Sequence, residues 1–402
     1  MAMAENEFRS QGKEAIRRMN LSAALESIRR AGSLSRTQLI KTLRLSRTTV
    51  FELVGQLSDL GLVIEDETPE TSGVGRPSFV VRPSSGVLAI SLNPESDALN
   101  AGLVTLDGRV VERMRTPYGE PLNPVATTEL AGKVIQELRD RAPARSRVVG
   151  LGVAVPGQVE RDSGIVRLAP RLGWQDVDIV SLLGRVVDLP VFVGNNARLA
   201  TIAEHRAGVG RGFSDFIYLF AGAGGMGGAT IVDDRIVVGK NGFAGELGHT
   251  RLSADEGRDF GGISGTLEAA VRRDDLLNLL GYTNLSDDEL DELVRDVPVE
   301  QIENLARRQL QFVGTLIGNL ANIFDPGRIA VGGFVGSLYR RFGDELDRSV
   351  RAVALPAIAR GLEIVSATDT TTMVLLGAAE QVFEVIVSDP FACGDSGIAT
   401  VR

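Results

Sequence analysis

Two asparagines and a sharp turn near the middle of the chain stand where a ligand could reach them. Residues 153–157 (Val-Ala-Val-Pro-Gly) follow a buried apolar run and turn at Gly157. Asn195 and Asn196 also follow a strand-like run, and they open the helix that comes next. In open α/β sheets, ligands bind beyond the carboxyl ends of the strands, so both segments are expected to face a cleft.

A second constellation combines a carboxylate, an imidazole and closely spaced glycines. Glu246 and His249 lie three residues apart beside a glycine turn, and their oxygens and nitrogens could bind hydroxyl groups. A histidine in such a place is also often a structural residue, and that interpretation stays open. The glycine-rich segment 221–228 could bring backbone N–H groups to an anion or could serve as a tight hairpin.

The N-terminal segment carries a strong excess of positive charge. Residues 9–50 hold ten basic and two acidic side chains, a net charge of +8, whereas the whole chain carries −9. A basic segment on an acidic body favours a nucleic-acid-binding module joined to a domain that does not bind nucleic acid. A solvated helical face would have the same composition, so charge alone leaves both interpretations open.

Three helices are expected in this segment. The first covers residues 20–31, the second begins with a capping box of Ser35 and Gln38, and the third is capped by Ser46 and ends at Gly61. The last two, joined by a short turn, make a helix-turn-helix. The second helix of such a pair enters the major groove of DNA by its N-terminal end.

Two extended stretches, 62–67 and 78–82, complete a winged helix over residues 9–85, which we call the head. The loop between them ends in Gly-Arg-Pro, which would bring Arg76 close to phosphate or a minor groove. A small helical oligomerisation module is the alternative. In a DNA-binding head, the predicted contacts are Ser35, Arg36, Ser46, Arg47, Thr48, Thr49, Glu52 and Arg76.

Beyond the head, apolar runs alternate with helical patterns, as is typical of an α/β fold. We expect lobe 1 at 86–196 and lobe 2 at 197–387, with the C-terminal helix returning to lobe 1, a cleft between the lobes and a flexible tail at 388–402. Strands are expected at 87–92, 99–105, 148–155, 190–193, 216–220, 228–232 and 328–331. Helices are expected at 124–141, 197–207, 264–280, 299–324, 337–353 and 375–387.

Composition excludes several classes of protein. The chain of 402 residues has one cysteine, Cys393, so neither an internal disulfide framework nor a multi-cysteine zinc site is possible. No uncharged apolar run reaches the roughly 18 residues of a membrane span, and the N-terminus lacks the apolar core of a secretory signal. We therefore expect a cytoplasmic protein with no membrane partner.

Taken together, these motifs resemble the ROK family of repressors, open reading frames and sugar kinases. The resemblance covers nearly the whole chain, with motifs in family order at 34–36, 45–50, 61–63, 75–77, 154–157, 172–174, 189–191, 195–197, 244–249, 265–268 and 331–333. It implies an actin-like, ribonuclease-H-like sugar kinase fold of two lobes, preceded by the winged helix-turn-helix.

The resemblance also implies a sugar or sugar-like effector between the lobes. In family kinases, sugar hydroxyls are bound by the residues that match Asn195, Glu246, His249 and Glu268. Carboxylates accept hydrogen bonds from hydroxyls, and an amide both donates and accepts, so these side chains suit that ligand. The predicted effector-binding residues are therefore Gly157, Asn195, Asn196, Glu246, His249 and Glu268.

The sequence departs from the family at three places. Asn196 replaces the catalytic aspartate, and a carboxamide cannot act as a base near neutral pH. Residues 91–95 (Ser-Leu-Asn-Pro-Glu) replace the Asp-x-Gly-Gly-Thr phosphate motif, and residues 259–266 lack the cysteines of the family's zinc site. We therefore expect no catalytic residue, no cofactor and no bound metal.

The leading hypothesis is a transcriptional regulator, a repressor, that binds a palindromic DNA operator as a homodimer or homotetramer and responds to a sugar effector. Two alternatives stay open. One is an active ATP-dependent sugar kinase with a regulatory DNA-binding head, and the other is a regulator that has lost sugar sensing.

Overall fold

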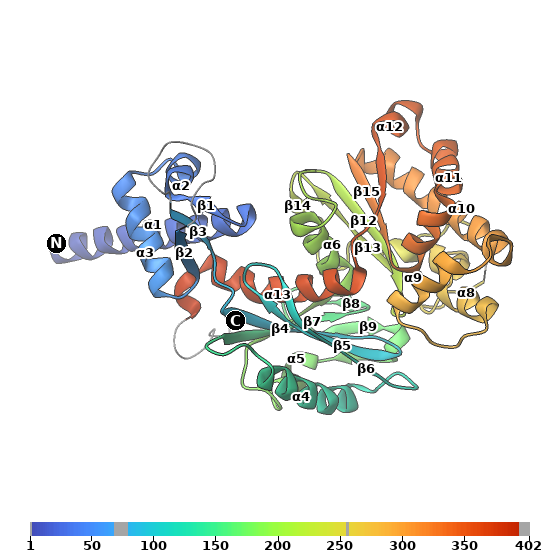
Figure 1. Cartoon of the computed structure of the whole chain (residues 1–402), viewed down its shortest axis with the longest axis horizontal. Coiled ribbons are helices and arrows are strands. Elements are labelled where there is room, and N and C mark those ends of the chain that lie inside the picture. Colours follow the sequence, from blue (N-terminus) through green and yellow to red (C-terminus); the bar gives the residue numbers. More distant parts are fainter. Residues whose placement is uncertain (1, 68–78, 255–256, 394–402) are drawn as a thin grey trace.

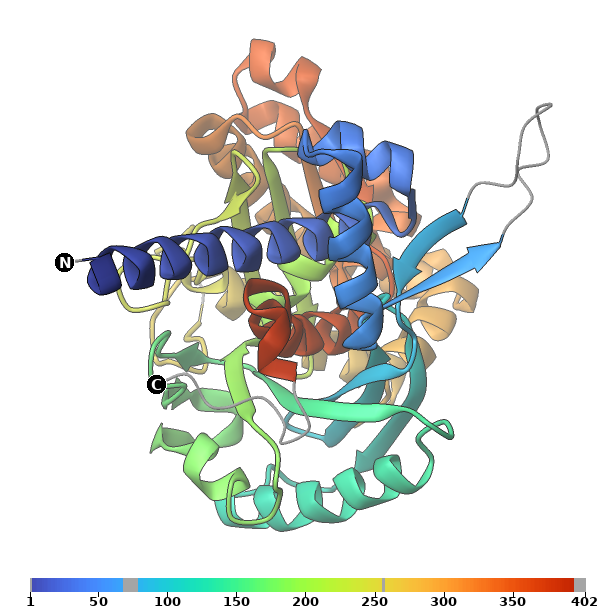
Figure 2. The same cartoon turned by 90° about the vertical axis from the view of Figure 1, so that its left-hand side faces the viewer.

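The computed structural model describes residues 2–67, 79–254 and 257–393, and every structural statement below concerns these residues (Figures 1 and 2). The head combines helices α1 (Ala2–Ala31), α2 (Arg36–Leu43) and α3 (Arg47–Asp59) with a small antiparallel sheet. The sheet has the order β1-β3-β2 and is built from β1 (Leu34–Ser35), β2 (Val63–Glu67) and β3 (Phe79–Pro83). The predicted helix-turn-helix and the paired strands of a wing are thus both present.

Local signals explain where these helices begin. Ser35 and Gln38 form the predicted capping box at α2, and the hydroxyl of Ser46 accepts from the backbone N–H of Thr49 at the start of α3. The predicted first helix was too short, because α1 begins at Ala2 instead of residue 20. Residues 2–19 contain no proline and many good helix formers. Their helix propensity favours continuing the helix toward the N-terminus even though this stretch has no apolar stripe.

Lobe 1 is built on a five-stranded mixed sheet with the order β11-β7-β4-β5-β6. Its strands are β4 (Val87–Pro94), β5 (Ala98–Thr105), β6 (Val110–Pro117), β7 (Arg147–Val155) and β11 (Val191–Asn195). One face is covered by α4 (Pro124–Asp140) and α5 (Ile179–Leu183). A small sheet of β8 (Gln158–Val159), β9 (Val166–Ala169) and β10 (Trp174–Val177), with the short helix η1 (Pro170–Leu172), lies beside it.

Lobe 2 is built on a second five-stranded sheet with the order β14-β13-β12-β15-β16. Its strands are β12 (Phe216–Gly222), β13 (Gly225–Val232), β14 (Arg235–Ile236), β15 (Arg328–Gly332) and β16 (Glu363–Ser366). Its outer helices are α8 (Arg273–Leu280), α9 (Asp287–Asp296), α10 (Val299–Phe324), α11 (Gly333–Val353) and α12 (Pro356–Gly361). The short helices η2 (Leu247–His249) and α7 (Leu267–Ala270) hold His249 and Glu268, which line the pocket between the lobes.

Two helices join the parts of the molecule. α6 (Asn196–Ala207) and α13 (Thr370–Ser388) pack against each other, and α13 also covers β4 and β7 of lobe 1 (Figure 1). The helices approach closely, since a Cβ at Gly377 would lie 2.1 Å from the carbonyl oxygen of Leu199. Among the described residues, α13 alone has the length and apolarity of a membrane span, but 72% of that stretch is buried within the fold, which accounts for its composition.

Most predicted strands and helices are present, with differences of a few residues at their ends. The helix expected at 264–280 is wrong in one respect, because the chain breaks between α7 and α8. The apolar pattern runs through the break since Leu267, Leu276 and Leu277 all pack into the same core. The edge strand β6 was not predicted, because its side chains are alternately half-buried and exposed and it carries few apolar residues.

The first part of the predicted tail belongs to the fold. Residues Pro390–Cys393 form the short helix η3, which packs against α13 and α1. The guanidinium groups of Arg17 and Arg18 lie 5.9 and 5.5 Å from the ring centre of Phe391, and Arg18 pairs with Asp389 at 3.2 Å. The prediction of a loose tail is therefore wrong for these residues, because contacts with the head stabilise them; residues 394–402 lie outside the described part.

Candidate functional site

A pocket lies between the two lobes, and it brings together the six positions that the sequence motifs indicated. It encloses about 620 Å³, including the open space at its mouth. The predicted residues that line it are Gly157, Asn195, Asn196, Glu246, His249 and Glu268.

The wall on the lobe 1 side is held by Asn195. Its Oδ1 accepts from the backbone N–H of Arg198 at 2.8 Å, which caps α6, and its Nδ2 donates to the carbonyl of Gly157 at 2.8 Å. Gly157 has φ +146°, and a Cβ there would lie 2.4 Å from the carbonyl oxygen of Leu168, so the turn requires glycine. Asn195 thus joins two lining segments and has a positioning role. The neighbouring Asn196 is buried at the first position of α6.

The wall on the lobe 2 side is organised around His249. Its Nδ1 lies 2.7 Å from Oδ2 of Asp259. Because a carboxylate can only accept, Nδ1 must carry the proton, which leaves Nε2 on the side of Glu246, 3.9 Å from its Oε2. Burial lowers the pKa of His249, but the hydrogen bond with Asp259 and the charges of Glu268, Asp259 and Glu246 outweigh it and raise the pKa.

Glu246 and Glu268 are carboxylates in a poorly solvated place. Burial raises the pKa of both, with the charge of His249 opposing the shift in each case. Glu268 accepts from the backbone N–H of Met226 at 3.0 Å. A Cβ at Gly225 would lie 2.3 Å from Oε1 of Glu268, so this hydrogen bond needs a glycine before Met226.

The glycine-rich segment 221–228 is the β12–β13 hairpin, with Gly222 paired to Gly225. The carbonyl of Ala223 in its turn accepts from Ser96 and Arg171, both at 2.9 Å, and so connects the two lobes. Of the two interpretations of this segment, the structure favours the hairpin, because the glycines allow close strand pairing and the N–H of Met226 is already bonded.

Two lining residues, Arg171 and Phe260, were not predicted. The guanidinium carbon of Arg171 lies 4.0 Å from the ring centre of Phe260, and Arg171 also pairs with Asp274 at 3.2 Å. Arg171 belongs to lobe 1 and its partners belong to lobe 2, so it closes one end of the pocket. The one sequence feature that could have pointed to Arg171 is its position directly before the motif at 172–174.

The zinc ion that the family resemblance implies does not fit this site. His249, Asp259 and Glu268 offer one ligand atom each, all within 4.8 Å of one another. A structural zinc site needs four ligands and is usually rich in cysteine, whereas Cys393 is the one cysteine of the chain. Both oxygens of Asp259 already accept hydrogen bonds from protein groups, so this carboxylate is not a free ligand.

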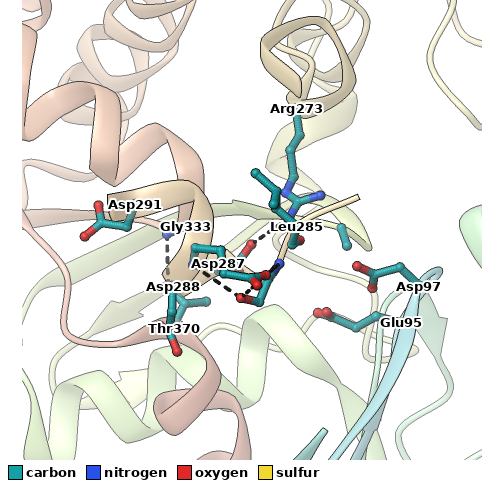
Figure 3. A network of polar contacts seen from close by, with 12 residues as sticks. Glu95, Asp97, Arg273, Leu285, Asp287, Asp288, Asp291, Gly333 and Thr370 are labelled. Atoms are coloured by element: carbon teal, nitrogen blue, oxygen red, sulfur yellow. Dashed lines mark hydrogen bonds and ion pairs between the residues drawn. The ribbon is translucent and has the colours of Figure 1, made fainter. Parts of the chain in front are cut away.

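A second cleft between the lobes is acidic (Figure 3). Glu95 and Asp97 follow β4 in lobe 1 and line this cleft together with Asp287 and Asp288 at the start of α9 in lobe 2. Burial raises the pKa of Glu95 to about 8, with the charges of Asp287 and Asp97 adding to the shift. Arg273, also lining the cleft, donates to the carbonyl of Leu285 at 2.5 Å and lies 3.5 Å from Asp287.

The predicted DNA-contact residues of the head occupy different environments. Arg47, Thr48 and Glu52 are exposed on the N-terminal half of α3. Beside them is Phe51, an exposed aromatic residue that the sequence analysis did not single out; its ring centre lies 5.4 Å from the guanidinium carbon of Arg47. These four residues form one exposed surface on the N-terminal half of α3.

The remaining predicted DNA contacts are partly occupied within the head. Ser35 and Ser46 cap α2 and α3, and the hydroxyl of Thr49 bonds that of Ser46 at 2.8 Å. Arg36 pairs with Glu65 at 2.5 Å and is half-buried. Arg76 lies outside the described residues.

This architecture is similar to that of known proteins. The model of the ROK family matches residues 91–384, well over half of the chain. The xylose repressor of Caldicellulosiruptor bescii is 28% identical over 347 residues, which cover 81% of this chain and 86% of that protein. The glucokinase of Halalkalibacterium halodurans is 27% identical over 296 residues, 67% of this chain and 87% of that protein.

A solved structure resembles nearly the whole molecule. It is that of a ROK family transcriptional regulator, described as a homolog of the E. coli MLC protein, with a TM-score of 0.73, 22% identity and coverage of 91% of this chain and 96% of that one. The likeness confirms the predicted actin-like fold of two lobes. With the family match over residues 91–384, it shows that the chain belongs to the ROK family.

Proposed function

We propose that this protein is a sugar-responsive transcriptional regulator, a repressor, whose head binds DNA and whose pocket between the lobes binds a sugar. The observation that carries the proposal is that Glu246, His249 and Glu268 bring hydroxyl-binding groups to one pocket between the lobes, while α3 presents exposed Arg47 at its N-terminal end. The similarity to a xylose repressor supports it. Helix-turn-helix proteins bind two half-sites as dimers, so a homodimer or homotetramer on a palindromic operator is part of the proposal.

The proposed function does not include phosphoryl transfer, although the chain is also similar to a glucokinase. The residue at the catalytic position, Asn196, is a buried carboxamide whose Oδ1 accepts from the backbone N–H of Ala197 at 2.8 Å. Asn93, where the phosphate motif would lie, donates to the carbonyl of Ala154 at 2.9 Å and is likewise buried.

The DNA-binding part predicts that the protein selects a shared inverted repeat from sheared genomic DNA of its source at near-physiological salt. Replacing Arg47 by alanine should then cost about 1–3 kcal/mol of affinity for that repeat if the guanidinium contacts a base. Affinities for the repeat and for random DNA are measured by fluorescence anisotropy, with Lys133→Ala on α4 as the control for losing one positive charge. An equal loss on both DNAs would show that Arg47 contacts phosphate only, and no selected repeat with or without sugar would contradict the proposal.

The sugar-binding part predicts that Glu246→Ala weakens binding at least tenfold. Its carboxylate faces the pocket, and a hydrogen bond to a charged group contributes about 1.5–3 kcal/mol. Calorimetry with D-xylose and D-glucose measures this, with Glu120→Ala at an exposed position as the control. A sugar that binds equally well to Glu246→Ala would contradict the assignment of this pocket, and binding of neither sugar nor other hexoses and pentoses would favour a regulator that has lost sugar sensing.

A further inference from the structure

The loop that completes the lobe 2 side of the pocket is organised by a buried carboxylate. The side chain of Asp259 is 0% exposed. Its Oδ2 accepts from Nδ1 of His249 at 2.7 Å and from the hydroxyl of Thr266 at 2.9 Å, and its Oδ1 accepts from the backbone N–H of Ile263 at 2.8 Å. One side chain thus bonds η2, the loop itself and the residue that caps α7.

Each of these bonds positions a part of the pocket. The hydrogen bond from His249 to Asp259 keeps a proton on Nδ1 and orients the ring so that Nε2 lies on the side of Glu246. The bond from Thr266 holds the cap of α7, because the same hydroxyl accepts from the backbone N–H of Ala269 at 3.2 Å, and α7 carries Glu268. The loop is closed by backbone pairing around Asp259, whose N–H donates to Ile263 and whose carbonyl accepts from Gly262.

We propose that Asp259 is the positioning residue of this pocket and that it replaces, by hydrogen bonds alone, the zinc ion that the family resemblance implies for this loop. The proposal rests on the proposed function insofar as the pocket binds a ligand. Three observations carry it: the missing cysteines, the full burial of the carboxylate, and the occupation of both its oxygens by donors from three segments. Charge-assisted hydrogen bonds of this kind are strong and directional, so a carboxylate can fix a ring and two backbone segments at once.

The test uses nitrogen-15 NMR of the histidine rings in the full-length protein. The chain has two histidines, so His205 is an internal reference. In the wild-type protein, His249 should show a protonated, hydrogen-bonded Nδ1. In Asp259→Asn, an NH2 group replaces one of the two accepting oxygens and the negative charge is lost. The protonated Nδ1 of His249 then loses its charged partner, so this signature of His249 should be lost while that of His205 is unchanged. Asp188→Asn at an exposed position serves as the matched control and should alter neither ring.

Two further measurements separate the proposal from its competitors. EDTA should change neither the melting temperature nor the His249 signals of the purified protein, and one equivalent of zinc should not bind. In calorimetry with whichever of D-xylose and D-glucose binds, Asp259→Asn should weaken binding about tenfold or more, as expected for a lost charge-assisted hydrogen bond.

The outcomes are distinct. A His249 signature that survives in Asp259→Asn, an EDTA-sensitive melting temperature, or an unchanged sugar affinity in that variant would each overturn the proposal. Neither the NMR nor the chelator measurement needs a sugar, and the chelator measurement uses the wild-type protein, so it does not depend on whether Asp259→Asn folds. Failure of all sugars to bind would therefore contradict the proposed function and still leave the role of Asp259 in ordering the loop open to direct measurement.

Discussion

Replacing Arg206 by alanine is expected to lower the free energy of unfolding by about 2–3 kcal/mol and to reduce the effect of sugar on DNA affinity. Arg206 donates to Glu380 of α13 at 2.9 Å and to both oxygens of Glu26 in the head at 2.9 and 3.0 Å. Glu380 in turn pairs with Arg29 of the head at 2.9 Å. Removing the central guanidinium leaves these carboxylates with less compensation in a partly buried place.

The estimate stays below the roughly 3–5 kcal/mol of a fully buried pair because the side chain of Glu26 is 43% exposed. Burial lowers the pKa of Arg206, but Glu380 and Glu26 outweigh it and raise the pKa, so the guanidinium stays charged. The position also matters for function. α6 begins at Asn196 in the pocket and carries Arg206 in its last turn, so a movement of α6 would reach the head directly through these ion pairs.

The measurement combines urea unfolding with DNA affinity in the presence and absence of the sugar that binds. A coupling free energy of about 1–3 kcal/mol is typical of allosteric coupling between two sites, and Arg206→Ala should reduce it while the affinity for sugar changes little. Arg30→Ala is the matched control, because Arg30 lies at the same junction and pairs with Asp234 at 3.7 Å with both side chains largely exposed. Arg206→Ala behaving like Arg30→Ala in both stability and coupling would refute this role.

Replacing Glu95 by glutamine is expected to make the protein more stable than the wild type at pH 9 and to leave it nearly as stable at pH 4.5. Burial, and then Asp287 and Asp97, raise the pKa of Glu95 from 4.5 to about 8 in the folded protein. A folded-state pKa above the unfolded value means that the stability is fully present below pH 4.5, falls as pH rises, and has lost this contribution above about pH 8.

The slope between those values is at most about 1.4 kcal/mol per pH unit for one proton. Urea unfolding of wild type and Glu95→Gln from pH 5 to 9 measures it, and the difference between the two curves isolates this carboxyl group. Glu129→Gln, at an exposed position on α4, controls for the loss of one negative charge. Parallel curves for wild type and Glu95→Gln would show that Glu95 titrates normally and that the cleft of Figure 3 is well solvated.

The sequence analysis was most successful where the signal is local. Ser35 with Gln38, and Ser46 with Thr49, predicted the starts of α2 and α3, because a cap joins groups three residues apart. Gly157, with φ +146°, was singled out as a sharp turn for the same kind of reason. Local signals failed where apolar spacing continued across a break, as between α7 and α8, and where an edge strand such as β6 carries few apolar residues.

The sequence by itself determined the alternation of elements, the helix-turn-helix and the residue types available to the pocket, because periodicity, capping and side-chain chemistry belong to neighbouring residues. The tertiary structure alone decided how those residues act. Arg206 meets Glu380 across 174 positions and Glu26 across 180, and the pKa of Glu95 depends on Asp287 from the other lobe. Desolvation and Coulomb interactions act through space, so their strength follows from how the lobes and the head pack and cannot be read from spacing along the chain.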